Sequence, residues 1–550
     1  MGATRLQTLR LGRGVAQHAL IAGKTGSGKS TLLHVLVTNL SMWYGPDEVE
    51  FYLVDFKKGV EFKTYATHVL PHARAVAVES DREFGLSVLQ RVDAELGRRG
   101  AIFRKAGVQD LPSYREATGQ ALPRTLLIID EFQEFFSEDD RLAQDAGLLL
   151  DRLVRQGRAF GIHVLLGSQT IGGTSGLARS TMGQMAVRIA LQTSEADSQV
   201  ILGDGNAAAR LLSRPGEAIY NDAGGLVEGN SPFQVAWLPD GQRDECLISV
   251  RPRAGEQGLG AEPTVVFEGN VAADITANAA LKALLEAEGP SATPAPRAWL
   301  GEPVAIKEPT AVVLRRQSGS NVLIVGQQEE AAMAMLMSAS ISLAAQQPVE
   351  ASFVAFDGSP ADSPLARVLP QLPDVLPHRV RLIDYRAVEE AFAELADELH
   401  RRRSGGPANP PAVFVLIYGL QRYRALRRRE DSFSFSTGDE EKKPSPDRQF
   451  ADLLREGPSL GMHVLAWADT PATVERTVDR NSVREFDHRV LFQMSAADSS
   501  NLIDSPLANK LGPYRALAYS EEQGVTEKFR PYALPTREWL EYVRSRLSRA

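Results

Sequence analysis

Cysteine is almost absent from this chain: among 550 residues, Cys246 is the only one. A single thiol excludes an internal disulfide and any zinc site built from several cysteines. Chains that use neither are typical of a reducing compartment, so the cysteine content favours the cytosol.

The chain also lacks long hydrophobic runs. The longest uncharged apolar stretch, Ala331–Ala345, contains three serines and falls short of the roughly 20 apolar residues of a membrane-spanning helix. We interpret it as a buried helix. The start, MGATRLQTLRLGRG, has no apolar core of a signal peptide. We therefore expect a cytoplasmic protein. Little more than one strand precedes the first motif, so an upstream membrane segment or a membrane-embedded partner at the inner face of the membrane stays open.

A basic excess is absent as well. The 61 Lys and Arg are outnumbered by 69 Asp and Glu, for a net charge of -8. This balance argues against a dedicated nucleic-acid binder but leaves room for a local basic channel. Arginines concentrate in segments 400–404 and 422–430, beside an acidic segment at 429–447. We interpret them as a self-neutralising surface, with contact to DNA phosphates or acidic cargo as the alternative.

The length suits two or three domains, and the strand pattern supports two. Apolar strands alternate with helices twice along the chain, which predicts α/β domains with mostly parallel sheets. The first set of predicted strands is 18–23, 49–55, 73–80, 125–130 and 163–169, and the second is 321–326, 351–357, 379–384, 412–418 and 463–469. A Pro/Ala/Ser-rich stretch near 290 separates them. We predict a first domain at 1–245, a connecting segment at 246–300 and a second domain at 301–550.

One motif in the first domain carries recognisable chemistry. GKTGSGKST, at 23–31, satisfies the pattern G-x-x-x-x-G-K-[ST] at a strand-to-helix junction. Its glycines let successive amides converge on phosphate oxygens, and the helix N-terminus adds a positive dipole end. Lys29 can reach the β- and γ-phosphates, and the Ser30 hydroxyl can ligate Mg²⁺. The predicted ATP-binding residues are Gly23, Lys24, Thr25, Gly26, Ser27, Gly28, Lys29, Ser30, Thr31 and Asp130.

A second motif, TLLIIDEFQEFF, supplies the acids that such a loop needs. Its apolar strand ends in Asp130 and Glu131. We predict that Asp130 holds the Mg²⁺ shell through water, and that Glu131 orients and deprotonates the attacking water. Gln169 ends the next strand, where its amide is a candidate sensor of the γ-phosphate; an ordinary strand-end polar residue is the alternative. We therefore predict an ATP site that uses Mg²⁺, with Glu131, Lys29 and Gln169 as catalytic residues.

Together with the segments between them, these motifs resemble the FtsK/SpoIIIE family of hexameric motor ATPases. The resemblance runs through 15–220 and rests on HALIAGKTGSGKS, YLVDFKKG, LPHA, ELGRRGAIFRKAGVQDLPSYR, LPRTLLIIDEFQEFF, GRAFGIHVLLGSQT and RIALQTSEADSQVILGDG. It implies RecA-like P-loop folds, ATP hydrolysis and a homo-oligomeric ring, a hexamer, with active sites between subunits. It also implies an arginine donated by the neighbouring subunit, with Arg91, Arg98, Arg99 and Arg158 as candidates. Arg188, Ser194 and Asp197 match a later family pattern, for which a structural role is the alternative.

Members of this family differ in cargo. VDFKKG, at 54–59, resembles the DFKGG of EccC-type ATPases of type VII secretion, which carry tandem motor domains, more than the Asp-Pro-Lys of DNA translocases. No C-terminal winged-helix pattern is evident. We therefore favour a motor for polypeptide cargo. A DNA translocase or DNA-processing motor of the FtsK/HerA class is one alternative, and an ATP-gated scaffold that rarely turns over is another.

The second domain repeats the pattern of the first domain but lacks its ATP-binding and catalytic residues. Residues 321–333 align without gaps on 18–30, and the Walker B and sensor strands repeat as well. The replacements are Ala331, Ala332 and Met333 for Gly28, Lys29 and Ser30, Tyr418 and Gly419 for Asp130 and Glu131, Pro458 for Arg158 and Asp469 for Gln169. Glu329 and Glu330 at the helix start would repel a triphosphate. We predict an internal duplication whose second copy does not hydrolyse ATP. The resemblance suggests ring architecture, regulation or signal-peptide docking for it; retention for packing alone is the alternative.

Overall fold

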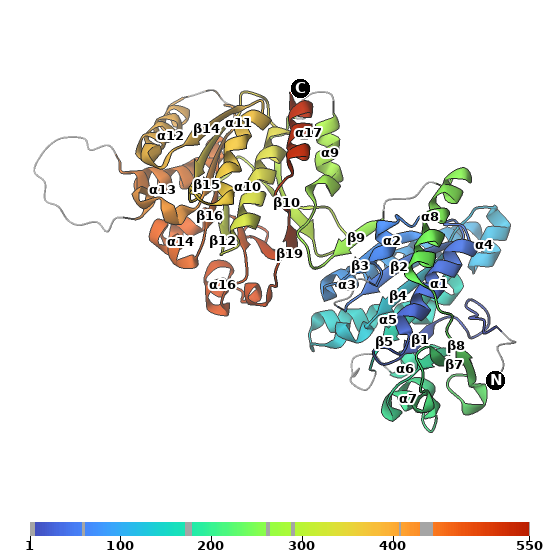
Figure 1. The fold of residues 1–550 in the computed structure, drawn as a ribbon. Coiled ribbons are helices and arrows are strands. Elements are labelled where there is room, and N and C mark those ends of the chain that lie inside the picture. The colour runs from blue at the N-terminus through green and yellow to red at the C-terminus, as the bar shows by residue number, and fades with distance from the viewer. Residues whose placement is uncertain are drawn as a thin grey trace, which may run out of the picture. The chain divides into compact units, whose positions relative to one another are not determined.

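The computed structural model describes residues 6–57, 61–170, 179–259, 264–287, 292–405, 407, 409–428 and 444–548. The chain forms two compact units, 1–269 and 270–550 (Figure 1). In the described part of the chain, no helix is both long and apolar enough to cross a membrane.

Unit 1 is built on a nine-stranded sheet with the order β8-β7-β6-β1-β5-β4-β2-β3-β9. Its strands are β1 (Ala19–Ala22), β2 (Val49–Asp55), β3 (Ala73–Val78), β4 (Arg124–Asp130), β5 (Ile162–Ser168), β6 (Val187–Leu191), β7 (Glu217–Asn221), β8 (Ser231–Gln234) and β9 (Val265–Glu268). Neighbouring strands in the run β6-β1-β5-β4-β2-β3-β9 all pair parallel. β7 pairs antiparallel with both β6 and β8. The central strands are buried on both faces, as continuous apolar runs require, so the predicted parallel sheet is confirmed.

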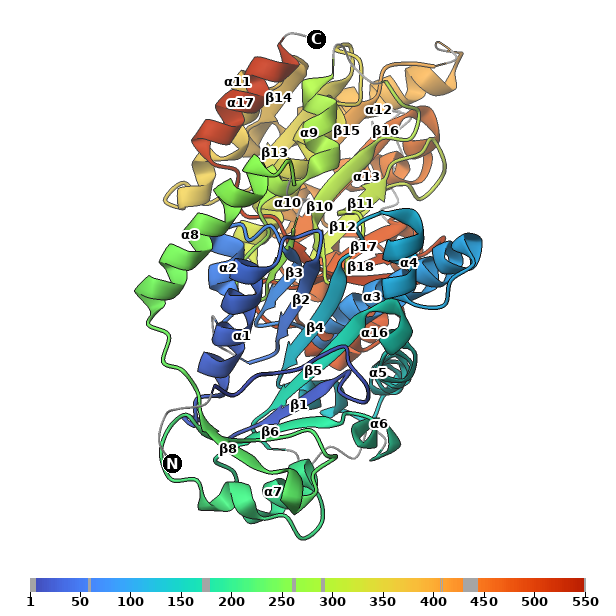
Figure 2. The same ribbon diagram turned by 90° about the vertical axis from the view of Figure 1, so that its right-hand side faces the viewer.

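Helices cover both faces of this sheet. They are α1 (Lys29–Trp43), α2 (Lys63–Thr67), α3 (Arg82–Ala106), α4 (Leu111–Thr118), α5 (Arg141–Phe160), α6 (Arg179–Gly183), α7 (Glu195–Leu202) and α8 (Asp240–Glu256). Figure 2 shows α1 and α8 on one face and α3 and α5 on the other. α5 begins at a cap in which the Asp140 carboxylate accepts from the Ala143 amide at 2.9 Å, and it ends at Gly161 in the left-handed region. These caps fix where β5 starts.

Unit 2 repeats this layout in a ten-stranded sheet, β11-β10-β19-β18-β17-β12-β16-β15-β13-β14. Its strands are β10 (Arg297–Pro303), β11 (Thr310–Val313), β12 (Val322–Val325), β13 (Ser352–Asp357), β14 (Arg379–Ile383), β15 (Val413–Tyr418), β16 (Met462–Ala468), β17 (His488–Leu491), β18 (Ala516–Ser520) and β19 (Val525–Pro531). The run β17-β12-β16-β15-β13-β14 matches β6-β1-β5-β4-β2-β3 of unit 1 strand for strand.

The helices of unit 2 also form two layers. They are α9 (Ala279–Glu286), α10 (Glu329–Ala344), α11 (Leu372–Val375), α12 (Val388–Arg403), α13 (Pro446–Glu456), α14 (Pro471–Thr477), α15 (Arg480–Val483), α16 (Ala496–Ile503) and α17 (Arg537–Leu547). α10, α9 and α17 lie on one side of the sheet and α12 and α13 on the other (Figure 1). α10 is buried almost along its whole length, which confirms that the apolar stretch from Ala331 forms a buried helix.

The boundary between the units differs from the predicted connecting segment, 246–300. α8 packs on α1 through Leu247 and Val250, and β9 pairs with β3, so both belong to unit 1. The chain passes to unit 2 after Gly269, and α9 already packs against α17. The low-complexity stretch that suggested a linker falls partly on residues 288–291, which lie outside the described residues. The composition therefore marked the stretch between α9 and β10, which lies inside unit 2, and not the boundary between the units. Sequence alone does not show which sheet a flanking strand joins.

Candidate nucleotide site

The predicted phosphate loop joins the end of β1 to the start of α1. Gly28 has φ +101, and a Cβ there would lie 3.1 Å from the amide nitrogen of Gly216. A Cβ on Gly23 would lie 2.5 Å from Ser27 Oγ. Only glycine fits both positions, because one needs left-handed backbone and the other a close approach. The loop therefore turns tightly and presents the free amides of the first turn of α1 at the carboxyl edge of the sheet.

Lys29 lies between the two predicted acids. Its side chain is 6% exposed, and Nζ contacts Asp130 Oδ1 and lies 2.9 Å from Glu131 Oε1. The strand order β1-β5-β4 brings these residues together, since parallel strands end at the same edge. Burial raises the pKa of Asp130, and Lys29 offsets that effect only in part. Burial acts on Glu131 too, but Lys29 and hydrogen bonds from Gln133 and the Gln169 amide outweigh it and lower the pKa of Glu131.

Two glutamines donate hydrogen bonds to Glu131 Oε2, the carboxylate oxygen that does not face Lys29. Gln133 Nε2 donates to Glu131 Oε2 at 2.7 Å, and the Gln169 amide donates to the same oxygen at 3.1 Å. The Gln169 side chain accepts from Thr25 Oγ1 at 2.8 Å, so the candidate sensor touches the phosphate loop. Glu131 itself has φ 56, a strained conformation for a residue with a side chain. Sequence reasoning missed Gln133, for which the one signal is its position two residues after Glu131, the predicted base.

Asp55 adds a third carboxylate that the sequence analysis did not assign. It pairs in register with Asp130 between β2 and β4 and is fully buried. Oδ1 accepts from the Lys57 amide at 2.9 Å, whereas Oδ2 has no hydrogen-bond partner among the described residues. Burial raises the pKa of Asp55 to about 7. The hydrogen bond from the Lys57 amide opposes this rise, and the charges of Asp130 and Glu61 add to the rise. Lys58 and Gly59, which completed the VDFKKG motif, lie outside the described residues.

The residues at this edge fit ATP with Mg²⁺. Within the part of the chain that the structure describes, Ser27 Oγ and Asp55 Oδ2 are buried polar atoms without partners, beside a loop whose glycines leave room for phosphate. Ser30 follows Lys29 in the first turn of α1, and Asp130 lies against Lys29. Hydroxyl and carboxylate oxygens are the ligands that Mg²⁺ prefers in phosphate sites.

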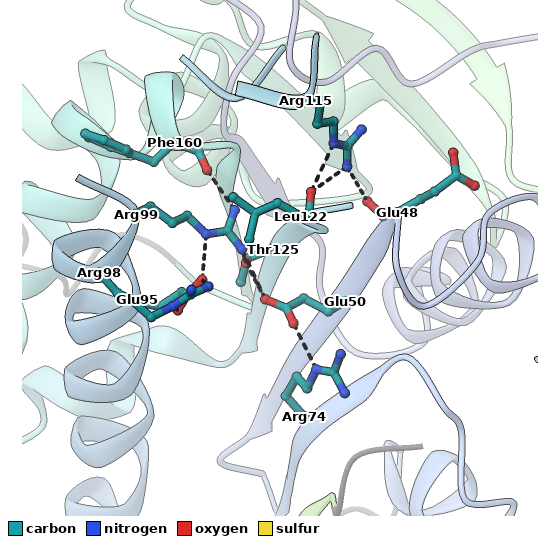
Figure 3. A network of polar contacts seen from close by, with 10 residues as sticks. All are labelled: Glu48, Glu50, Arg74, Glu95, Arg98, Arg99, Arg115, Leu122, Thr125 and Phe160. Carbon is teal, nitrogen blue, oxygen red and sulfur yellow. Dashed lines mark hydrogen bonds and ion pairs between the residues drawn. The ribbon is translucent and has the colours of Figure 1, made fainter. Parts of the chain in front are cut away.

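The four candidate arginines have different surroundings, and Figure 3 shows two of them, Arg98 and Arg99. Arg99 is fully buried: it donates to Glu95 Oε1 and to the Phe160 carbonyl at 2.7 Å each and to Thr125 Oγ1 at 2.9 Å. Its place in the interior removes it from the candidates for an arginine that reaches another subunit. Arg98 is held by both oxygens of Glu95, and Arg91 hydrogen-bonds with Tyr52. Arg158 is exposed in the last turn of α5.

The later family pattern has structural contacts in both units. Arg188 Nη1 donates to the Ile201 carbonyl at 2.8 Å, and Ser194 caps α7 by accepting from the Asp197 amide at 3.1 Å. Arg489, Ser495 and Asp498 repeat these contacts at the same distances. The pattern therefore holds β6 to α7, and its counterpart in unit 2 holds β17 to α16.

The corresponding site of unit 2 is filled by aromatic rings. Tyr418 stands at the end of β15 where unit 1 has Asp130, and its ring stacks on Trp467 of β16. Trp467 Nε1 donates to the Gly326 carbonyl at 2.9 Å, and Tyr418 OH donates to the Glu329 carbonyl at 3.3 Å. Both bonds end on the segment that corresponds to the phosphate loop. The second unit therefore uses the frame of the site for packing.

The basic segment 400–404 of unit 2 pairs with glutamates. Arg401 binds both oxygens of Glu398, Arg402 is buried with Glu398 at 2.6 Å, and Arg403 lies 3.3 Å from Glu456. Most of the acidic segment, 429–443, lies outside the described residues. For 400–404 the ion pairs agree with the interpretation of a self-neutralising surface, and for 422–430 that interpretation stays a prediction.

The fold and site of unit 1 define a P-loop nucleotide-binding domain of the RecA-like type. The sequence model of the FtsK/SpoIIIE family matches residues 9–173. The matched range includes the phosphate loop and the Asp130–Glu131 pair.

Similar proteins include ESX secretion system proteins and DNA translocases. The ESX-5 secretion system protein EccC5 of Mycobacterium tuberculosis is 35% identical over 205 residues, covering 35% of this chain and 14% of that protein. The ESX secretion system protein YukB of Bacillus subtilis is 25% identical and covers 94% of this chain and 36% of its own length. DNA translocase FtsK of Lactiplantibacillus plantarum is 32% identical over 249 residues, 42% of this chain and 29% of that protein. The chain thus spans well under half of these relatives.

Solved structures match both units together. The cytoplasmic domain of the Thermomonospora curvata type VII secretion ATPase EccC superposes with a TM-score of 0.62 at 22% identity, covering 98% of this chain and 63% of that one. ATPases 2 and 3 of the same EccC, in complex with a signal sequence peptide, give 0.53 at 18% identity, with 95% and 89% covered. These likenesses establish tandem RecA-like domains as the fold of the chain.

Proposed function

We propose that unit 1 binds ATP with Mg²⁺ and hydrolyses it, and that unit 2 does neither. The observation that carries the proposal is the meeting of Lys29, Asp130 and Glu131 at the end of the phosphate loop. Lys29 exchanges these carboxylates for β- and γ-phosphate oxygens, which frees Glu131 to orient the attacking water. Ser30 and Asp130 hold Mg²⁺, the latter through water, and the ion neutralises charge on the phosphates. Gln169, tied to Thr25, is proposed to sense the γ-phosphate.

We propose further that hydrolysis drives a motor for a polypeptide in a type VII secretion-like system. The support is the likeness of the whole chain to YukB and to the tandem ATPase domains of EccC, together with the net charge of -8. A DNA translocase is the second candidate, favoured by the 32% identity of unit 1 to an FtsK. An ATP-gated scaffold with rare turnover is a third, and the intact Glu131 speaks against it.

Ring assembly would complete the site with an arginine from the neighbouring copy, and we propose Arg158 for this role. It is exposed, while Arg99 is buried and Arg98 is held by Glu95. Unit 2, which lacks the acids, also lacks this arginine and has Pro458 there. An Arg158→Ala variant should lose turnover but still bind nucleotide.

For unit 2 we propose a non-catalytic role, either docking of a polypeptide segment or packing of the ring. The EccC structure with a signal sequence peptide supports docking. By the same likeness, the chain works at the cytoplasmic face of a membrane, beside a membrane-embedded partner or an upstream membrane segment.

The rate of ATP hydrolysis with and without duplex DNA, at low salt, separates the candidate functions. A polypeptide motor should show a rate that DNA leaves unchanged and that Lys29→Ala abolishes. Strong stimulation by DNA that Lys29→Ala removes would overturn the secretion proposal. A Glu131→Gln variant that keeps full biological function would support the scaffold instead.

A further inference from the structure

Glu131 needs a second support once ATP displaces Lys29 from it. One oxygen of its carboxylate, Oε1, lies 2.9 Å from Lys29 Nζ, and that contact is lost when Lys29 turns to phosphate. The other oxygen, Oε2, accepts from Gln133 Nε2 at 2.7 Å and from the Gln169 backbone amide at 3.1 Å. Neither of these bonds involves Lys29, so we expect Oε2 to keep its donors while Oε1 becomes free for water.

Gln133 belongs to a turn that is anchored on both sides. The turn is the short helix Phe132–Phe136, in which Phe132 and Phe135 are 0% exposed. Arg82 Nη2 donates to the Phe135 carbonyl at 2.8 Å and so ties this helix to the start of α3. The backbone that carries Gln133 is therefore fixed by its buried neighbours.

The orientation of the Gln133 amide follows from what faces its two ends. A carboxylate only accepts hydrogen bonds, so the end at Glu131 must be the nitrogen. The oxygen end then faces Ser168 Oγ at 2.8 Å, and Ser168 is fully buried at the end of β5. The Ser168 hydroxyl has a second acceptor, the Thr170 carbonyl at 2.7 Å, and its one proton serves either oxygen. When that proton points at Gln133, both ends of the amide hold the orientation that donates to Glu131.

Unit 2 keeps the glutamine but has neither of its two partners. The aligned residues of unit 2 are Gln421 for Gln133, Gly419 for Glu131, Ala468 for Ser168 and Asp469 for Gln169. In unit 2 the Asp469 amide donates to Gln421 Oε1 at 3.4 Å. The oxygen of Gln421 thus accepts a bond that Glu131 accepts in unit 1. The glutamine of unit 2 therefore presents an acceptor at the strand end, whereas Gln133, between Glu131 and Ser168, presents a donor to the carboxylate.

We propose that Gln133 is a positioning residue that holds Glu131 Oε2 while Oε1 takes the proton of the attacking water, and that Ser168 sets the orientation of the Gln133 amide. The inference rests on the proposed ATP site of unit 1 and on Glu131 as its base. It gives Gln133 no contact with nucleotide or Mg²⁺. Loss of Gln133 should therefore slow the chemical step and leave nucleotide affinity unchanged.

The test is a double-mutant cycle on the full chain, with single-turnover hydrolysis at saturating ATP and Mg²⁺ as the readout. Gln133→Met keeps the length of the side chain and removes its donor. The rate should fall about tenfold, while the Kd for a non-hydrolysable ATP analogue stays within about twofold. In a Glu131→Gln protein, Gln133→Met should change the remaining rate by less than about twofold, because the carboxylate that Gln133 positions is gone. Ser168→Ala should lower the parent rate about threefold and have no further effect in the Gln133→Met protein.

Gln144→Met, at an exposed glutamine on α5, is the matched control and should leave rate and affinity unaltered. A Gln133→Met protein with the parent rate, or an equal loss with and without Glu131, would overturn the inference and leave the ATP site intact. Ser168→Ala at the parent rate would overturn the part assigned to Ser168. A parent protein that hydrolyses no ATP, or a Glu131→Gln protein as fast as the parent, would overturn the proposed function and this inference with it. Thermal unfolding of each variant shows whether a lower rate reflects loss of the fold.

Discussion

The ring of Tyr418 stacks on the indole of Trp467 with 4.5 Å between their centroids. Tyr418 occupies the place of Asp130, and Trp467 that of Gly167, in the same strand register. In unit 1 a Cβ on Gly167 would lie 2.5 Å from Asp130 Oδ1, so the acid needs a neighbour without a side chain. The acid and the glycine are therefore one feature, and unit 2 has replaced both with a packed pair.

This coupling predicts the effect of one methyl group. Gly167→Ala should displace the Asp130 carboxylate from Lys29 and lower the rate of ATP hydrolysis at least tenfold, with weaker Mg²⁺-dependent nucleotide binding. Steady-state kinetics and nucleotide titration measure both. Gly97→Ala is the control, since no described neighbour lies within 4 Å of a Cβ there on the exposed side of α3, and it should add helix stability of up to about 1 kcal/mol. Equal rates for Gly167→Ala and the parent would refute the coupling.

Glu131→Gln should separate binding from turnover. The amide keeps the size of the side chain but cannot take a proton from water, so kcat should fall by about 10²- to 10⁴-fold while nucleotide still binds. Rapid-quench measurement of a single turnover checks the chemical step directly. If single-turnover hydrolysis proceeds at the parent rate, Glu131 is not the base.

The buried Arg99 predicts a large effect on stability without a direct effect on chemistry. Arg99→Ala removes a fully buried guanidinium from Glu95, the Phe160 carbonyl and Thr125 and leaves a cavity, so it should cost about 3–5 kcal/mol even though Glu95 keeps Arg98 and Glu50 keeps Arg74. Arg98→Ala removes an exposed pair worth about 0–1 kcal/mol. Arg402 repeats the arrangement in unit 2, with Glu398 and the Leu460 carbonyl at 2.7 Å. Thermal unfolding with and without Mg²⁺ and ATP identifies the transition of unit 1, because only that transition shifts with ligand. Similar shifts for Arg98→Ala and Arg99→Ala would contradict the burial argument.

Acid should destabilise unit 1 through His18. Its Nδ1 accepts from the Val164 amide at 3.0 Å, and burial, with a contribution from the nearby His163, lowers the pKa of His18 from 6.5 to about 3. Because the folded pKa is depressed, the unfolded state binds the proton first, and stability is lost as pH falls below 6.5, by about 1.4 kcal/mol per pH unit. Asn321 makes the same bond to Val464 at 2.9 Å in unit 2.

The substitution His18→Asn should therefore keep the fold and remove this part of the acid sensitivity. Between pH 7 and pH 5 the parent should lose roughly 2 kcal/mol more than the variant, measured on the ligand-shifted transition. Parallel pH profiles for the two proteins would show that His18 does not carry the effect. His163, whose pKa burial lowers to about 4, titrates in both proteins and cancels in the comparison.

The sequence predicted the parts of the site that are contiguous in the chain. The phosphate loop and the Asp130–Glu131 pair are local patterns, and their meeting follows from parallel strands ending at one edge. Asp55 was not predicted as a site residue, because its place beside Asp130 arises from the pairing of two strands that are far apart in the chain. Gln133 was missed although it lies in the same segment as Glu131, because the pattern does not show which way its amide points. Arg99 was misplaced among the surface candidates because an arginine on an amphipathic helix reads as solvated unless its buried partners are known. The stack of Tyr418 on Trp467 required strand register, which the alignment of motifs did not supply.

The stoichiometry of nucleotide binding tests the central claim, that the chain has one competent ATP site and that it lies in unit 1. Isothermal titration of the full chain with a non-hydrolysable ATP analogue and Mg²⁺ should give one site per chain, and Lys29→Ala should abolish binding. Two sites per chain, or one site that survives Lys29→Ala, would place nucleotide in unit 2 and contradict the account.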